Sequence, residues 1–198
     1  MKRRNSVSTW SYLMPRWLPV TTDPLLAGRA KLILATCSGL VLGAWGLALT
    51  WLISGDLQIE TVVVMVVFSI MLLGITVVSR SGRTTLAAWL LIVLLGLATV
   101  YDATYYGLGA PDIVFFVLPI ILAACLIGLS AGMITAIIGT IVTWGIAVGA
   151  LQGWLEVAIP FRMDHLTFYA PVISIVFLLA AVIVGWWSRY TSQLIKRV

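Results

Sequence analysis

Residues 113–155, IVFFVLPIILAACLIGLSAGMITAIIGTIVTWGIAVGALQGWL, run between Asp112 and Glu156 without a single charged side chain. A membrane helix needs about 20 apolar residues to cross the hydrocarbon core of a bilayer, and this stretch is roughly twice as long. Gly128 and Gly132 lie near its middle, where glycine permits a tight turn between helices. The stretch therefore predicts a hairpin of two membrane helices.

Similar apolar runs recur along the chain, each bounded by charges or turn residues. Of the 198 residues, 62% are hydrophobic and 10% are charged. Soluble domains carry about 25% charged residues, so this composition excludes a water-soluble domain. We predict an all-α fold, a polytopic membrane bundle with six transmembrane helices at about 32–54, 61–79, 84–106, 112–129, 132–152 and 169–188.

The few charges orient this bundle. With the N-terminus inside, every Lys and Arg except Arg162 falls on the cytoplasmic side, and every Asp and Glu except Asp23 falls outside. Basic residues favour the cytoplasmic side of membrane proteins. We therefore expect a multi-pass protein of the inner (plasma) membrane with both termini cytoplasmic. Its parts are an N-terminal segment, 1–31, a membrane domain, 32–188, and a C-terminal tail, 189–198.

The predicted spans hold no ionisable side chain near their middle, although ion-coupled pumps and transporters usually keep such groups there. The single histidine, His165, falls in an outer loop, which excludes bis-histidine haem binding within the membrane. No catalytic or phosphate-binding motif is present. We expect no enzymatic activity, no catalytic residue, no metal site, no cofactor and no nucleic-acid binding.

Polar side chains gather on the predicted outer surface. This cluster could be solvated loop charge, a weak cation site or a pH-responsive group acting through its histidine. Its members are Asp102, Tyr105, Asp112, Glu156, Asp164 and His165.

Small residues recur at four-residue spacing and predict faces where helix backbones approach closely. Packing within the chain is one use of such faces, and docking of a protein partner or a second copy is another. The candidate residues are Ala35, Gly39, Gly43, Gly128, Gly132, Gly139, Gly145 and Gly149.

Pro119 falls inside the predicted span 112–129. Proline removes a backbone hydrogen bond, so we expect a kink here, either structural or lining a site.

Four stretches carry a family resemblance: RSGRTTLAAW at 80–89, YYGLGAP at 105–111, LPIILAAC at 118–125 leading to the two hairpin glycines, and QGWL at 152–155. Together they resemble the six-helix membrane input regions of bacterial sensor histidine kinases and related signalling proteins, over about 29–195. In that family the last helix continues into a cytoplasmic coiled coil and an output module. Here neither a phosphoacceptor histidine nor a nucleotide-binding motif follows, which implies a stand-alone relative or an isolated input region.

Three functions fit these observations. The first is a non-enzymatic sensory or signalling module acting through a cytoplasmic partner. The alternative is a structural or accessory subunit of a larger membrane complex. A small-molecule-binding transporter component is the third, although the spans offer few convergent polar groups for a ligand.

Overall fold

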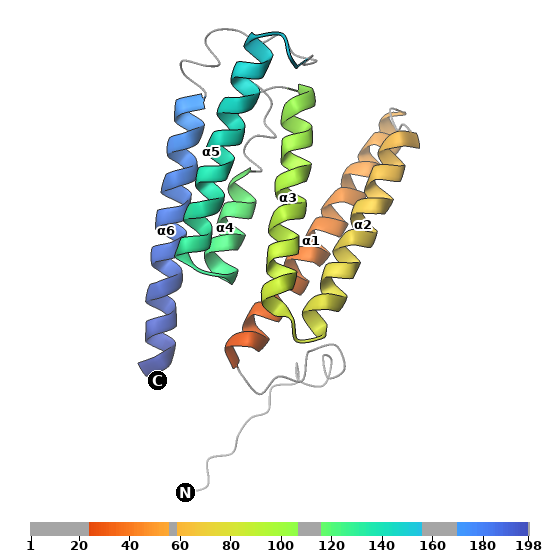
Figure 1. Cartoon of the computed structure of the whole chain (residues 1–198). Helices are drawn as coiled ribbons and strands as arrows, with labels where there is room; N and C mark the ends of the chain where they lie inside the picture. The colour runs from red at the N-terminus through yellow and green to blue at the C-terminus, as the bar shows by residue number, and fades with distance from the viewer. Residues whose placement is uncertain (1–23, 56–58, 107–115, 156–169, 198) are drawn as a thin grey trace, which may run out of the picture. The chain divides into compact units, whose positions relative to one another are not determined.

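The computed structural model describes residues 24–55, 59–106, 116–155 and 170–197. The described chain is helical throughout, without a strand, as the sequence predicts (Figure 1). In chain order the helices are α1 (Pro24–Ser54), α2 (Ile59–Arg80), α3 (Thr84–Tyr106), α4 (Val117–Leu126), α5 (Leu129–Leu151) and α6 (Ala170–Arg197).

Five of these helices contain segments long and apolar enough to cross a membrane, and α4 does not. At 1.5 Å per residue, the 10 residues of α4 cover about 15 Å, half of the hydrocarbon core. We predict a full fourth span over 112–129, but the described helix covers only Val117–Leu126. The class of multi-pass helical protein is thus confirmed, while the number of crossings and the orientation stay predictions.

The chain divides into two compact units, Met1–Ala87 and Ala88–Val198. In the first unit α1 and α2 lie side by side as an antiparallel hairpin (Figure 1). The buried side chains of this unit include Ile33 of α1 and Leu72 of α2, whereas most of the large apolar side chains of both helices are exposed. Such outward-facing apolar surface is what a hydrocarbon environment requires.

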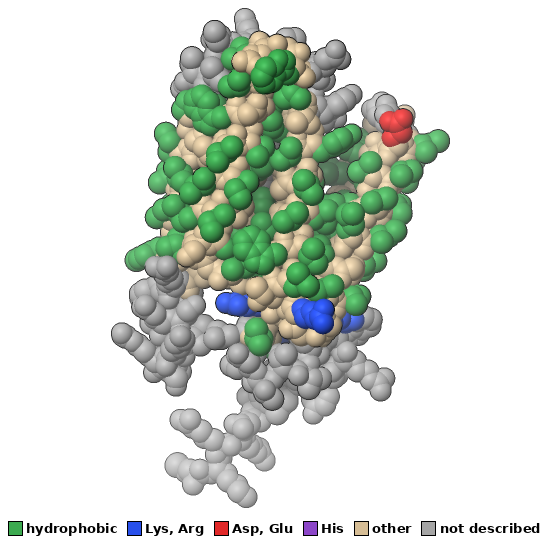
Figure 2. Space-filling model, viewed as in Figure 1, with side chains coloured by type: hydrophobic (Ala, Val, Ile, Leu, Met, Phe, Trp, Pro, Cys, Tyr) green, Lys and Arg blue, Asp and Glu red, His purple; other side chains and the backbone are tan. Residues whose placement is uncertain are grey.

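Charge separates along this hairpin. Glu60 lies in the first turn of α2 and Arg80 in its last turn. Arg29 and Lys31 lie near the start of α1, so the antiparallel arrangement places them at the same end as Arg80. Figure 2 shows blue Lys and Arg side chains gathered at one end of the molecule's apolar surface.

Glycine closes the turn after α2. Gly82 has a φ of 86°, a left-handed conformation that glycine adopts without a Cβ clash. The N–H groups of Ser81 and Gly82 donate to the carbonyls of Val77 and Ser79, at 3.0 and 3.3 Å. These bonds satisfy carbonyls that the helix end would leave without partners.

The second unit contains the predicted helical hairpin. α4 and α5 meet at Gly128. Its φ is 138°, a positive value that glycine adopts readily because it has no Cβ. Its N–H donates to the carbonyl of Ala123 at 3.0 Å and so caps α4. Gly132, which the sequence places at the same turn, lies instead inside α5.

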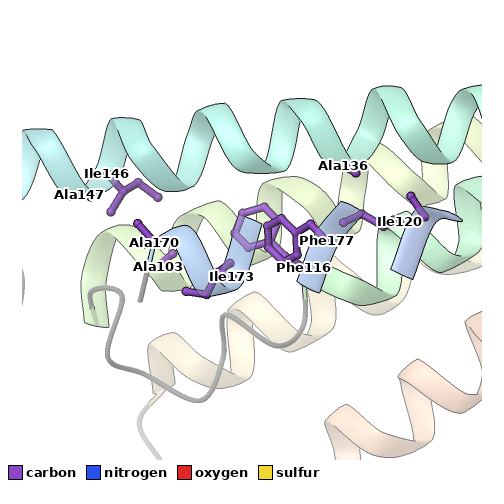
Figure 3. Close-up of a cluster of buried hydrophobic side chains, with 10 residues drawn as sticks. Ala103, Phe116, Ile120, Ala136, Ile146, Ala147, Ala170, Ile173 and Phe177 are labelled. Carbon is purple, nitrogen blue, oxygen red and sulfur yellow. The ribbon is translucent and has the colours of Figure 1, made fainter. Parts of the chain in front are cut away.

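A hydrophobic core joins α4, α5 and α6, with Ala103 contributed by α3 (Figure 3). At its centre the rings of Phe116 and Phe177 lie 5.6 Å apart between centroids, inclined at 47°, a favourable aromatic geometry. The core consists of Ala103, Phe116, Ile120, Ala136, Ile146, Ala147, Ala170, Ile173, Phe177 and Ala181.

Helix α6 continues beyond its apolar segment. The helix has 28 residues, and its apolar segment, Ala170–Ser188, accounts for 19 of them. The sequence predicts the end of this span near 188, and that boundary stays a prediction. The backbone nevertheless remains helical to Arg197, through the segment interpreted above as a tail.

Candidate functional site

A cavity of about 280 Å³ lies among α3, α4 and α5 of the second unit. Trp89, Gly96 and Val100 line it from α3, Ile120 from α4, and Phe116 from the position just before α4, with further residues from α5. These helices place the cavity at the depth of the apolar segments rather than at their ends.

The wall of this cavity is almost entirely apolar. Its polar groups are the hydroxyl of Thr135 and the indole of Trp89. The Thr135 hydroxyl donates to the carbonyl of Ala131 at 2.8 Å, so its proton is already used within α5. Among the described residues, no acidic or basic side chain lines the cavity. Its wall therefore matches an apolar group.

Each unit also contains one hydrogen bond from a tryptophan to a serine on the neighbouring helix. In the first unit the indole N–H of Trp45 donates to the hydroxyl of Ser69 at 3.2 Å. In the second unit Trp144 donates to Ser174, also at 3.2 Å. Both serine hydroxyls donate in turn to the carbonyl four residues earlier, at 2.8 and 2.7 Å. Sequence reasoning missed both pairs, because their members lie on different helices and share no spacing signal.

Some of the predicted helix-packing residues lie against a neighbouring side chain, and others do not. A Cβ built on Gly132 would lie 2.8 Å from the Cβ of Ala124, one on Gly139 would lie 3.2 Å from the Phe177 ring, and one on Gly149 would lie 3.0 Å from Leu155. The other predicted glycines, Gly39, Gly43, Gly128 and Gly145, have no such neighbour within 4 Å, and Ala35 is exposed.

Sequence reasoning missed Gly185 of α6, the closest approach among the described glycines. A Cβ there would meet the side chain of Leu129 and lie 3.2 Å from its Cα. The signal was available, because Ala181 precedes Gly185 by four residues and is fully buried.

The predicted outer polar cluster falls largely outside the described residues. Asp102 is half-buried near the end of α3, and Tyr105 lies in the last turn of that helix. Four members lie outside the described chain, so the cluster stays a prediction: Asp112, Glu156, Asp164 and His165.

Pro119 lies in the first turn of α4 as described, two residues after Val117. The N–H groups of a first helical turn have no partner within the helix, so proline fits there without breaking a bond. Residues 107–115 lie outside the described chain, and the predicted kink stays a prediction.

Few other groups in the described chain are chemically distinctive. Its His, Cys, Asp and Glu side chains form no group of three that could hold a metal ion. Both cysteines, Cys37 and Cys125, are free. The hydroxyls of Ser79 and Thr140 are buried without a hydrogen-bond partner, and neither lines the cavity.

The fold and this apolar site define an all-helical, multi-pass membrane protein. Comparison with models of protein families, with curated proteins and with solved structures finds no match. The resemblance to sensor input regions therefore stays a prediction.

Proposed function

We propose that this protein is a non-enzymatic sensory or signalling module of the inner membrane, which acts on a cytoplasmic partner through helix α6. The observation that carries the proposal is the length of α6. The helix continues without a break from its apolar segment to Arg197. A continuous helix transmits displacement from the membrane to its far end better than a flexible tail would.

Contacts between α6 and the core support this route. Phe177 is only 1% exposed, and its ring contacts Phe116, the residue just before α4, and the backbone position of Gly139 on α5. Phe116 also lines the cavity. An apolar stimulus that enters the cavity would press on Phe116 and, through it, on Phe177. The two rings therefore connect a membrane-accessible space to the helix that leaves the membrane.

The basic residues support the orientation that this proposal needs. Arg29, Lys31, Arg80 and Arg83 lie at one end of the first unit, and Glu60 lies at the other. The preference of basic residues for the cytoplasmic side places the N-terminus inside. An even number of crossings then brings the end of α6 to the cytoplasm, where Arg189, Lys196 and Arg197 agree with the same preference.

The test is recovery of a signalling protein from membranes in mild detergent. The full chain is compared with a variant lacking 189–198 and with Leu179→Ala, a change on the exposed surface of α6. We expect a signalling protein to co-purify with the full chain and with Leu179→Ala, and to be lost from the truncated variant. Recovery of no signalling protein, or equal recovery without 189–198, would contradict the proposal.

The second candidate, an accessory subunit of a membrane complex, is favoured by one observation. Ala35, Gly39 and Gly43 of α1 form a stripe of small residues that is exposed in the described chain. Such stripes allow close approach of another membrane helix. Co-purification of a membrane complex at fixed stoichiometry, abolished by Gly39→Leu, would favour this function. Monomeric behaviour of the protein in every detergent would count against it.

A further inference from the structure

A second apolar space lies in the first unit, between α1 and α2. This groove has a volume of about 320 Å³ and is lined by residues that include Leu34, Ser38 and Val41 of α1 and Leu73 and Thr76 of α2. The hydroxyl of Thr76 donates to the carbonyl of Leu72 at 2.9 Å. The groove therefore offers a mainly hydrocarbon surface at membrane depth.

Two cations lie on the same helix faces as the groove. Lys31 precedes Leu34 by three residues and Ser38 by seven, which places all three on one face of α1. Arg80 follows Thr76 by four residues and shares its face of α2. Because the helices are antiparallel, Lys31 and Arg80 lie at the same end of the hairpin, each about one helical turn beyond the residues that line the groove.

The hydrogen bond between Trp45 and Ser69 crosses from α1 to α2 toward the other end of this face. From Arg80 to Ser69, α2 rises roughly 16 Å at 1.5 Å per residue. One leaflet contributes about 15 Å of the bilayer's hydrocarbon. The groove itself extends from Leu34 to Leu42 of α1, about 12 Å along the helix, so it would hold most of the length of one acyl chain in a leaflet.

We propose that this groove binds one acyl chain of an anionic phospholipid, with its phosphate held by Lys31 and Arg80. An apolar trough with cations beyond one end matches a molecule with an apolar chain and an anionic end. This inference rests on the membrane placement of α1 and α2, and it is independent of the proposed signalling function.

The test is native mass spectrometry of the full chain after exchange into mixed micelles of dioleoyl phosphatidylglycerol and dioleoyl phosphatidylcholine. We expect one phosphatidylglycerol to be retained in preference to phosphatidylcholine. Lys31→Gln should reduce this preference about fivefold, the typical contribution of one basic side chain near an anionic leaflet. Ser38→Leu fills the groove and should reduce retention of both lipids.

Two matched variants control for general effects. Arg29→Gln removes a charge from the same end of α1, two residues away and on the opposite side of the helix. Gly43→Leu adds the same side chain as Ser38→Leu at a position with open space and outside the groove. Both should bind lipid as the unaltered chain does. Helical circular dichroism establishes that all four variants are folded.

Three results would overturn the proposal. Equal loss of preference in Arg29→Gln and Lys31→Gln would show diffuse attraction instead of a site. Unchanged retention in Ser38→Leu would show that the groove holds no acyl chain. Displacement of the lipid by inorganic phosphate at equal concentration, or equal retention of dihexanoyl phosphatidylglycerol, would show that the phosphate alone is recognised.

Discussion

Both units hold apolar helices together, but different contacts stabilise them. In the first unit, no described glycine has a neighbouring atom within 4 Å of an added Cβ. In the second unit Gly132, Gly139, Gly149 and Gly185 all do. Lipid tails are as apolar as leucine, so apolar side chains alone give helices little reason to associate in a membrane. Close backbone approach therefore holds the second unit, whereas the α1–α2 hairpin leaves more of its surface to lipid.

Both units share the tryptophan-to-serine hydrogen bond, with the same length of 3.2 Å. The polar contact is thus constant while the packing around it differs. This comparison yields four predictions, each measured as the free energy of unfolding in mixed detergent micelles followed by helical circular dichroism.

The largest effect is expected from Phe177→Ala. The ring is almost fully buried against Phe116, so its removal leaves a cavity and should cost about 3–5 kcal/mol. Leu179→Ala, on the same helix but 54% exposed, should cost much less. Leu72→Ala in the first unit should cost less than Phe177→Ala, since a two-helix hairpin collapses more readily. A larger loss of stability in Leu72→Ala than in Phe177→Ala would contradict the distinction between the two units.

Gly132→Ala should come next, with a loss of about 1–3 kcal/mol from overpacking. The added Cβ would lie 2.8 Å from Ala124 Cβ and 3.2 Å from Ala124 Cα, and neither atom can move without its backbone. Gly145→Ala on the same helix has open space and is the matched control. Gly39→Ala tests the first unit, where the change should be neutral or stabilising. Equal losses at Gly132 and Gly39 would contradict the distinction between the units.

Gly96→Leu should stabilise the second unit by about 0.5–2 kcal/mol, as cavity-filling substitutions do. Gly96 lines the 280 Å³ cavity, and a Cβ there meets no atom within 4 Å. Gly74→Leu, which also has open space but lies on α2 outside that cavity, is the control. A loss of stability in Gly96→Leu would contradict this prediction, because it would show that the cavity has no room for a leucine side chain at this position.

The smallest effect is expected from the hydrogen bonds themselves. Trp45→Phe and Trp144→Phe each keep an aromatic ring and remove the indole donor, so each should cost about 0.6 kcal/mol, the average for interhelical bonds in membranes. Double-mutant cycles with Ser69→Ala and Ser174→Ala measure the coupling in each unit. Coupling in one unit and none in the other would show that the shared bond has different roles.

The sequence predicts where apolar segments lie better than where helices begin and end. The first span is predicted at 32–54, but α1 begins at Pro24 because Arg29 and Lys31 are good helix formers and do not interrupt it. For the same reason α6 continues to Arg197. Hydropathy indicates whether a helical segment lies in lipid or in water, whereas backbone hydrogen bonding determines how far the helix extends. The short length of α4 could not be predicted either, since the residues on both sides of this helix are as apolar as the helix itself.

The four-residue spacing of small residues also predicts helix faces that allow close packing, but it does not indicate which of these faces contact another helix. Gly39 and Gly139 have similar sequence surroundings, yet only Gly139 has the ring of Phe177 against it. The difference comes from a partner 38 positions further along the chain, which no local pattern contains. The cavity in the second unit could not be predicted for the same reason, because three helices supply its wall.

The pairing of Trp144 with Ser174 has a consequence for movement. The serine hydroxyl uses its proton on the carbonyl of Ala170, so toward the indole it acts only as an acceptor. Small rotations of α5 against α6 preserve this bond, but a slide by one helical turn, about 5.4 Å, breaks it. The bond therefore disfavours a slide of α6 along α5 by a full turn, whereas a small tilt of one helix against the other leaves it in place.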